Sequence, residues 1–286
     1  MNSSNWIRVN RENPCPICEH SDACSVSANG TEACCSRVPS DKLIGQPFAG
    51  GYIHKLTDPS PVPKRTPKRP VKPAERAQDF YALSKQYREN LTPMLLTSLR
   101  FDLCVSEESL LRLGIGYDGR NYSFPMRDGG DGEIVGIKLR SPNGKKFCVP
   151  TSNLGLYWPY GVEADSNNLL FIAEGESDTA ALLDMGFDAI GRPSCSGGTE
   201  HIKTLLTRHD RQVIIMADKD TPKTRPDGSV WRPGQEGAYR LAAEIKSIVR
   251  SVRVIKPSVG KDVRQWYIAG AIKAVILAVA KNAKFL

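Results

Sequence analysis

Acidic side chains follow two apolar stretches in the C-terminal half of the sequence. Glu174 comes directly after the apolar run 169–173, and Asp218 and Asp220 come after the run 213–217. Because parallel strands deliver their carboxyl ends to one edge of a sheet, we expect Glu174, Asp218 and Asp220 to converge. Crowded carboxylates repel one another unless a cation neutralises them, and Mg²⁺ takes oxygen ligands of this kind. The pattern therefore predicts a site for Mg²⁺ (or Mn²⁺) held by these three residues.

Two further acids lie close to the same strand ends. Asp178 stands four residues after Glu174, just inside the next predicted helix, and Asp262 follows the predicted strand 252–255. From its position alone, Asp262 is equally suited to joining the acidic group and to capping the helix that follows. For any single acid the simpler interpretation is a solvated loop residue or a helix cap. That interpretation weakens when three acids follow two strands in the same manner.

A second group of residues with metal-binding chemistry lies near the N-terminus. Five of the eight cysteines fall between residues 15 and 35. Cys15 and Cys18 form a CPxC turn, which can hold one face of a tetrahedral Zn²⁺, and Cys24 and Cys35 can complete the site. A module this small cannot bury enough apolar surface to fold unaided, and bound zinc would supply the missing free energy. The alternative is a tail with free or oxidised thiols.

The fourth zinc ligand has competing candidates. The segment 24–35 has the pattern of a hairpin with an Asn29-Gly30 turn, which would carry Cys24 and Cys35. Neighbouring residues on a strand point to opposite faces, so Cys34 and Cys35 are not expected to bind the same ion. His20 is a spare candidate.

The elements that must position these residues can be read from the hydrophobic pattern. From residue 169 onward, apolar runs alternate with helical segments, which predicts a parallel sheet with helices on both faces. The expected strands are 169–173, one that starts at 189–190, 213–217 and 252–255; the expected helices are 177–185, 199–208 and 236–249, with two more closing the chain. Upstream, a helical pattern begins near Arg76 and is followed by the short strand-like segments 123–127, 134–140 and 146–150.

The 286 residues are 40% hydrophobic and 24% charged, which is ordinary for a globular protein and excludes wholesale disorder. The net charge is +8, which suits a polyanionic partner. Much of the excess lies around six prolines between residues 59 and 73, a composition typical of an extended, semi-rigid linker. No apolar run has membrane-spanning length and no signal peptide is recognisable, so we expect a cytoplasmic protein with no membrane partner.

Three blocks in the C-terminal half resemble the signature of the TOPRIM fold, which is shared by bacterial-type primases, topoisomerases, recombination-mediator proteins and OLD-family nucleases. They are segment 172–178, the pair Asp218 and Asp220, and segment 260–262. Four upstream segments are similar to the RNA-polymerase core of DnaG-type primases: 124–128, 134–140, 144–147 and 155–157. The loop 196–201 resembles the loop that follows the second TOPRIM strand of these primases. The resemblance spans roughly residues 14–266 and is closest to primases of phages, plasmids and other mobile elements.

The resemblance implies roles for individual residues. Glu174 and Asp178 stand at the first acidic pair of the family, Asp218 and Asp220 at the pair that holds magnesium, and Asp262 at the third acidic block. The family has a basic ridge that contacts template and nucleotide phosphates. The residues that match it are Arg127, Lys138, Arg140 and Lys145 or Lys146, and we add Lys261 as a further candidate. Two features depart from the family: the segment after Asp220 is longer than the usual short turn, and the cysteine spacing is not a simple double CxxC.

The predicted fold class is therefore α/β, with a TOPRIM parallel-sheet catalytic core preceded by a mixed α+β subdomain and a small N-terminal zinc ribbon. The expected domains are a zinc-binding domain 1–58, a linker 59–75, a basic subdomain 76–165, a TOPRIM domain 166–260 and C-terminal helices 261–286.

The function that the resemblance implies is that of a DNA primase. Such an enzyme makes short RNA primers on single-stranded DNA from ribonucleoside triphosphates, here with a separately encoded replicative helicase as the expected partner. Two alternatives stand beside it. One is a TOPRIM-type, magnesium-dependent nuclease, because the same acids can support phosphodiester hydrolysis. The other is a non-enzymatic, zinc-containing DNA-binding accessory protein in which the acids are structural.

Overall fold

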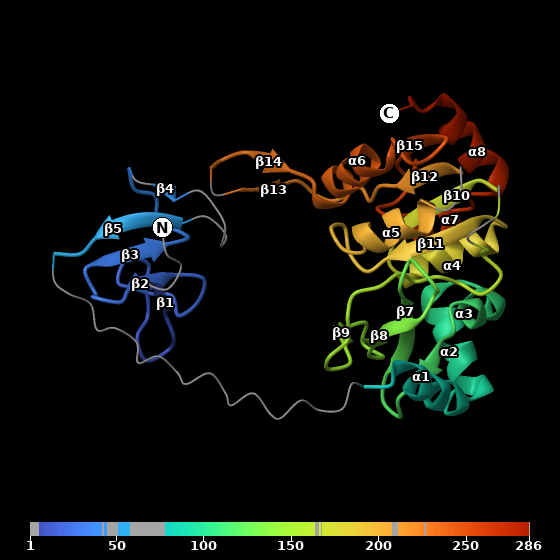
Figure 1. The fold of residues 1–286 in the computed structure, drawn as a ribbon, viewed down its shortest axis with the longest axis horizontal. Helices are drawn as coiled ribbons and strands as arrows, with labels where there is room; N and C mark the ends of the chain where they lie inside the picture. The colour runs from blue at the N-terminus through green and yellow to red at the C-terminus, as the bar shows by residue number, and fades with distance from the viewer. Residues whose placement is uncertain are drawn as a thin grey trace. The chain divides into compact units, whose positions relative to one another are not determined.

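The computed structural model describes residues 6–41, 43–44, 51–57, 78–163, 166, 168–207, 211–225 and 227–285 (Figure 1). The described residues form two compact units. The first lies within residues 1–76 and includes 224–230, and the second comprises residues within 77–223 and 231–286. The predicted linker 59–75 lies outside the described residues.

The first unit contains a five-stranded antiparallel sheet in the order β1-β2-β3-β5-β4. Its strands are β1 (Trp6–Arg8), β2 (Ser25–Ser27), β3 (Glu32–Cys35), β4 (Leu43–Ile44) and β5 (Gly51–Lys55). Strands β2 and β3 form the predicted hairpin, in which the Ser27 hydroxyl donates to Asn29 Oδ1 (2.7 Å) and Gly30 takes a φ of 73°. Few apolar residues are buried in this unit, and its buried cluster includes three cysteines: Val9, Cys15, Cys24, Val26 and Cys35.

The second unit is built on a parallel sheet in the order β11-β10-β12-β15. Its strands are β10 (Leu170–Glu174), β11 (Asp188–Arg192), β12 (Gln212–Met216) and β15 (Ser251–Ile255). Consecutive residues of β10 and β12, such as Phe171, Ile172, Ile214 and Ile215, are all buried, as expected for strands covered on both faces. The predicted parallel sheet is confirmed, with strand bounds within three residues of those expected.

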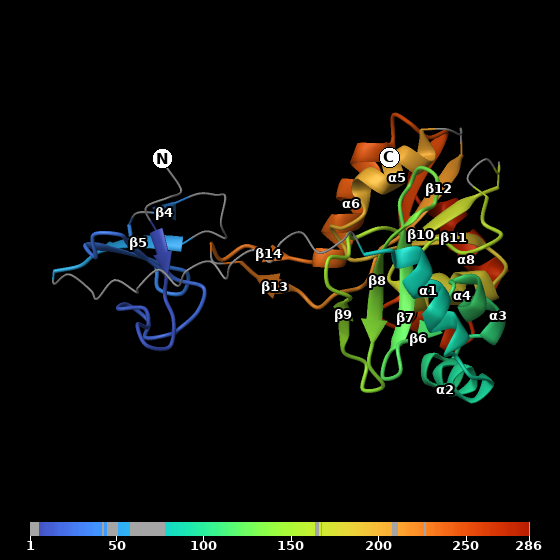
Figure 2. The same ribbon diagram turned by 60° about the horizontal axis from the view of Figure 1, so that its bottom comes forward.

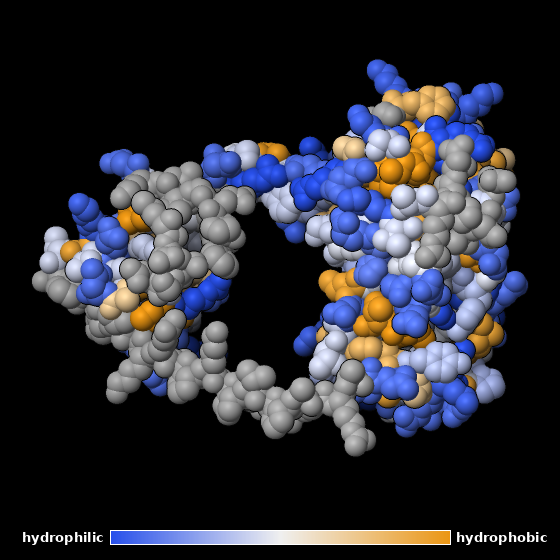
Figure 3. Space-filling view, in the orientation of Figure 1, coloured by the Kyte–Doolittle hydropathy of each residue, from blue (hydrophilic) through white to orange (hydrophobic). Residues whose placement is uncertain are grey.

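Helices cover both faces of this sheet. They are α4 (Glu176–Asp184), α5 (Thr199–Leu206), α6 (Pro233–Ile245), α7 (Val263–Ile268) and α8 (Lys273–Asn282). Figure 2 shows α5 and α6 on one side of the sheet and α4 and α8 on the other. On the face of this unit drawn in Figure 3, hydrophilic residues surround separate apolar patches. None of the helices within the described ranges combines the length and the apolar character needed to cross a membrane.

An antiparallel sheet with three helices precedes the parallel sheet in the chain. Its order is β6-β7-β8-β9, made of β6 (Gly116–Tyr117), β7 (Tyr122–Arg127), β8 (Ile134–Arg140) and β9 (Lys146–Cys148). Backbone bridges from Leu156 to Arg127 and from Tyr157 to Gly191 connect this sheet to β11 of the parallel sheet. The predicted strands of the basic subdomain thereby have a fixed position relative to the acidic strand ends.

Some elements differ from the sequence-based prediction. The helix expected from about Arg76 is α1 (Phe80–Glu89), which begins at Phe80 because the Asp79 carboxylate caps it by accepting from the Ala82 N–H. Helices α2 (Pro93–Leu103) and α3 (Glu107–Arg112) were not predicted, although Thr92 and Ser106 cap them in the same way. The long segment after Asp220 forms a hairpin of β13 (Lys223–Thr224) and β14 (Val230–Trp231), which the sequence did not indicate either.

Candidate functional site

The carboxyl edge of the parallel sheet brings the predicted acids together. Glu174 is the last residue of β10, and Asp218 lies two residues beyond the end of the neighbouring strand β12. Strand β15 lies on the other side of β12, and the chain after it leads to Asp262 at the start of α7. The expectation that parallel strands would deliver Glu174, Asp218 and Asp220 to one edge agrees with this arrangement.

Mutual repulsion shows in the pKa values of these acids. Burial raises the pKa of Asp218 to about 7, and the charges of Glu174 and Asp262 add to the rise. Burial and the Asp220 charge raise the pKa of Glu174. Asp178 is buried, and its pKa is raised well above the ordinary value by desolvation and by Asp262 and Asp218. An edge that holds this much unfavourable negative charge suits a divalent cation, because a bound cation would favour the ionised carboxylates.

Helix starts hold three of the acids by backbone hydrogen bonds. Asp220 Oδ2 accepts from the Gly234 N–H (2.6 Å) in the first turn of α6, and Asp178 Oδ1 accepts from the Arg264 N–H (2.9 Å). Asp262 caps α7 by accepting from the Gln265 N–H (2.8 Å). Asp262 therefore combines the two roles that the sequence left open, since it caps a helix and also acts electrostatically on the acidic edge.

The acids line an open edge instead of forming a closed cage. Within the described ranges, the acids do not form a close-set group of three or more metal-ligand atoms of the kind that the four cysteines form. Glu174, Asp218 and Asp220 are only partly buried, so their free oxygens can face a ligand. A cation here would complete its shell with water or substrate oxygens, as Mg²⁺ commonly does.

Three of the predicted basic residues lie at the acidic edge or beside it. Lys261 Nζ is 3.4 Å from Asp220 Oδ1. Lys146 Nζ on β9 is 2.6 Å from Glu176 Oε1, and Arg140 Nη1 on β8 is 3.5 Å from the same oxygen. The turn between Glu174 and Glu176 also approaches Lys146 closely, because a Cβ added at Gly175 would lie 3.9 Å from Lys146 Nζ.

The other predicted basic residues occupy different surroundings. Arg127 donates to the Gly132 carbonyl (2.8 Å) and its guanidinium lies 4.8 Å from the centre of the Tyr160 ring. Lys138 is half-buried in the middle of β8, and Lys145 is exposed in the turn between β8 and β9. Among the predicted basic residues, the structure thus pairs Lys261 with Asp220, and it pairs Arg140 and Lys146 with Glu176, which distinguishes Lys146 from Lys145.

Two residues near the acids were missed by the sequence analysis. Arg192 ends β11 in register with Glu174, is 4% exposed, and donates to the Gly197 carbonyl at 3.1 Å. Burial lowers the pKa of Arg192, while the nearby Glu174 carboxylate favours its charge. Its position at a strand end is the signal that could have revealed it. Glu176, whose side chain is 1% exposed, lies between two acids that were predicted but was not itself considered.

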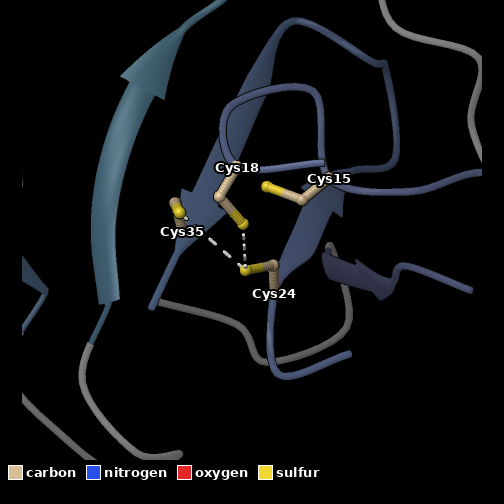
Figure 4. A group of neighbouring side chains, drawn as sticks. All are labelled: Cys15, Cys18, Cys24 and Cys35. Carbon is tan, nitrogen blue, oxygen red and sulfur yellow. Dashed lines mark hydrogen bonds between the residues drawn. The ribbon is translucent and has the colours of Figure 1, made fainter. Parts of the chain in front are cut away.

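Four cysteine side chains of the first unit point toward one another (Figure 4). The sulfur atoms of Cys15, Cys18, Cys24 and Cys35 all lie within 4.8 Å of one another. Two of the separations are 3.7 Å (Cys18 to Cys24) and 3.9 Å (Cys24 to Cys35). With Zn–S bonds of about 2.3 Å, the edge of a tetrahedron is about 3.8 Å, so the cluster fits Zn²⁺.

Backbone donors face one sulfur of the cluster. Cys35 Sγ accepts from the backbone N–H groups of Arg37 (3.4 Å) and Val38 (3.3 Å). The two alternative ligands are placed elsewhere: His20 Nδ1 interacts with the Cys18 carbonyl, and Cys34 lies against Gly51, where a Cβ would be 2.5 Å from its sulfur. The four cysteines are therefore the ones predicted, with Cys35 and not Cys34 beside the other three.

No protein-family model matches the chain, and the search of curated proteins finds no relative. Solved structures do match. A DnaG catalytic core has a TM-score of 0.56 at 21% identity, with 73% of this chain and 80% of that one covered. A DnaG primase catalytic domain solved with single-stranded DNA has a TM-score of 0.55 at 21% identity, over 72% and 77% of the two chains. The zinc-binding and RNA-polymerase domains of the Aquifex aeolicus primase have a TM-score of 0.57 at 14% identity, over 73% and 60%. These likenesses confirm the predicted fold class: the chain has the fold of a DnaG-type primase catalytic core, together with a four-cysteine cluster near its N-terminus.

Proposed function

We propose that this protein is a DNA primase that makes short RNA primers on single-stranded DNA by magnesium-dependent nucleotidyl transfer. The observation that carries the proposal is the edge of the parallel sheet, where Glu174, Asp218 and Asp220 gather, with Lys261 beside Asp220 and with Lys146 and Arg140 paired to the neighbouring Glu176. The fold supports it, because this edge belongs to the fold of DnaG catalytic cores.

The proposed division of labour follows from the placement of the acids. Glu174, Asp218 and Asp220 are partly exposed at the edge and would hold Mg²⁺. Magnesium, when bound, would stabilise the charge that develops on the reacting phosphate and on the attacking hydroxyl. Asp178 is buried and bonded to the start of α7, so it would orient this region without contacting substrate. Asp262 would act in the same way from its capping position.

Basic side chains would bind the polyanionic substrates. Phosphoryl transfer needs positive charge near the equatorial oxygens. Lys261 lies beside Asp220, and Arg140 and Lys146 lie beside Glu176, two residues from Glu174. We propose that Arg127, Lys138 and Lys145 contact the template farther along the antiparallel sheet. The four-cysteine module, which fits Zn²⁺, would help to select the start site on the template. We further propose a cytoplasmic protein of a mobile element, working with a separately encoded helicase.

Incubation with a single-stranded DNA template, the four ribonucleoside triphosphates and Mg²⁺ tests the proposal. We expect short RNA products from the unaltered protein, their loss in Asp218→Ala, and their persistence in Asp102→Ala, which changes an exposed acid of α2. Degradation of the template without synthesis would favour a nuclease. Binding of the template without either reaction would favour an accessory DNA-binding protein, and both results would overturn the primase proposal.

A further inference from the structure

Glu176 has unusual surroundings for an acidic side chain. It is the first residue of α4, two positions after Glu174, and its side chain is only 1% exposed. Neither of its carboxylate oxygens accepts a hydrogen bond of regular geometry from the part of the chain that the structure describes. Its close partners are instead two cations, Lys146 Nζ at 2.6 Å and Arg140 Nη1 at 3.5 Å, both from its Oε1.

Because Glu176 is buried, its carboxylate depends on the two neighbouring cations. A carboxylate removed from water is strongly disfavoured unless a charge compensates it, so Glu176 needs Lys146 and Arg140 close by. The two cations are less constrained by burial, since their side chains are 35% and 19% exposed. They can therefore reach solvent, or a ligand, on the side away from Glu176. The Gly175 turn keeps this trio beside Glu174, because Lys146 Nζ lies close to Gly175.

We infer that Glu176 is a positioning residue: its buried carboxylate holds Lys146 and Arg140 beside the acidic edge and cancels one of their two charges, which sets how phosphate is bound there. This inference rests on the proposed function, because it assigns phosphate groups of template or nucleotide to these cations. Glu176 itself contacts no substrate in this view, since its oxygens are enclosed by protein.

The charge balance of the trio gives a measurable consequence. Lys146, Arg140 and Glu176 together carry a net charge of one, so the group should neutralise about one phosphate. Removing the charge of Glu176 leaves two cations available. For single strands each additional neutralised phosphate steepens the dependence of log K on log salt by about 0.7. A residue that only filled space would leave this slope unchanged.

The first experiment measures binding of the full chain to a fluorescent single-stranded oligonucleotide between low and moderate salt. We expect Glu176→Gln to steepen the salt dependence by about 0.7 relative to the unaltered protein. In a Lys146→Met background, Glu176→Gln should also steepen the salt dependence by about 0.7. This pair provides a second comparison if the single variant folds poorly. Glu200→Gln is the matched control, because Glu200 pairs with Lys203 at 3.0 Å on the surface, where its side chain is 81% exposed. Unchanged slopes in both backgrounds would overturn the inference.

The second experiment measures primer synthesis and separates positioning from packing. If Glu176 acts through Lys146, Glu176→Gln should lower kcat about tenfold in the unaltered background and less than twofold after Lys146→Met. Equal losses in the two backgrounds would mean that Glu176 does not act through Lys146. Absence of primer synthesis in the unaltered protein, together with the steeper salt dependence, would overturn the proposed function and leave the role of Glu176 standing. If the unaltered protein binds no single-stranded DNA, both proposals are wrong.

Discussion

Replacement of Asp218 by asparagine should stabilise the protein when magnesium is absent. Burial raises the pKa of the Asp218 carboxyl from the ordinary 3.8 to about 7, and the charges of Glu174 and Asp262 add to the rise. Above that pH the folded protein must keep an ionised carboxylate in an unfavourable place. Asparagine has nearly the same shape without the charge, so Asp218→Asn removes this cost.

The sign and the size of the effect follow from linkage. An unfolded aspartate titrates near pH 3.9, so between pH 4 and pH 7 the folded state binds more protons than the unfolded state, and stability falls as the pH rises. The full difference in pKa corresponds to about 4 kcal/mol at 1.36 kcal/mol per pH unit. Local rearrangement and solvent will absorb part of it, and we expect about 2 kcal/mol at pH 8. For a domain of about 200 residues this raises Tm by about 4–8 °C.

Thermal unfolding followed by circular dichroism at pH 5 and pH 8 is the appropriate assay. The buffers are free of magnesium but contain no chelator, so that any zinc at the cysteine cluster is retained. We expect Asp218→Asn to raise Tm at pH 8 and to lose more than half of that gain at pH 5. Added Mg²⁺ should stabilise the unaltered protein more than the variant, because it binds the ionised site.

Asp102→Asn serves as the control for a general effect of removing an acidic charge. Asp102 is exposed on α2, and substitutions at such positions usually change stability by less than about 0.5 kcal/mol. A Tm for Asp218→Asn that is equal to or below that of the unaltered protein at pH 8 would refute the idea that burial and the neighbouring acids make an ionised Asp218 unfavourable at this edge.

Three further outcomes are expected. Removal of zinc should unfold the small sheet of residues 6–57 and leave the parallel-sheet unit folded, as read by hydrogen exchange; simultaneous loss of both units would contradict this. Cys35→Ser should abolish stoichiometric zinc in metal analysis while Cys34→Ser retains it, and equal retention would exclude Cys35 as a ligand. Lys138→Glu should weaken binding of single-stranded DNA most at low salt and flatten the salt dependence, whereas an unchanged slope would mean that this side chain only faces solvent.

The acidic edge was predictable because it depends on one rule of parallel sheets. Apolar runs marked the strands, and the residues just after them had to lie at a common edge. The same rule points to Arg192 at the end of the strand that starts at 189–190, but the sequence did not mark where that strand ends, and Arg192 is its last residue. The cysteine set was predictable for a similar reason, since alternation along β3 separates Cys34 from Cys35.

The contacts of Glu176 could not be predicted in this way. They depend on how the β8–β9 hairpin docks beside the first turn of α4, and these elements are about 30 residues apart in the chain. The bridges through Leu156 and Tyr157 connect the sheet of this hairpin to β11, and no local pattern reveals them. Helices α2 and α3 were missed for a different reason: their apolar residues do not follow a regular helical spacing, and their capping residues Thr92 and Ser106 were not used as helix starts.

The bond between Asp220 and the Gly234 N–H also bears on how this chain tolerates insertions. It closes segment 221–233 at its base, so the length of the β13–β14 hairpin is uncoupled from the position of the carboxylate. Side chains are excluded at the base of the segment, because a Cβ at Gly234 would lie 2.9 Å from Asp220 Oδ2. A Cβ at Gly228 would meet nothing within 4 Å. Reporter peptides or crosslinking handles can accordingly be introduced near Gly228 without displacing Asp220.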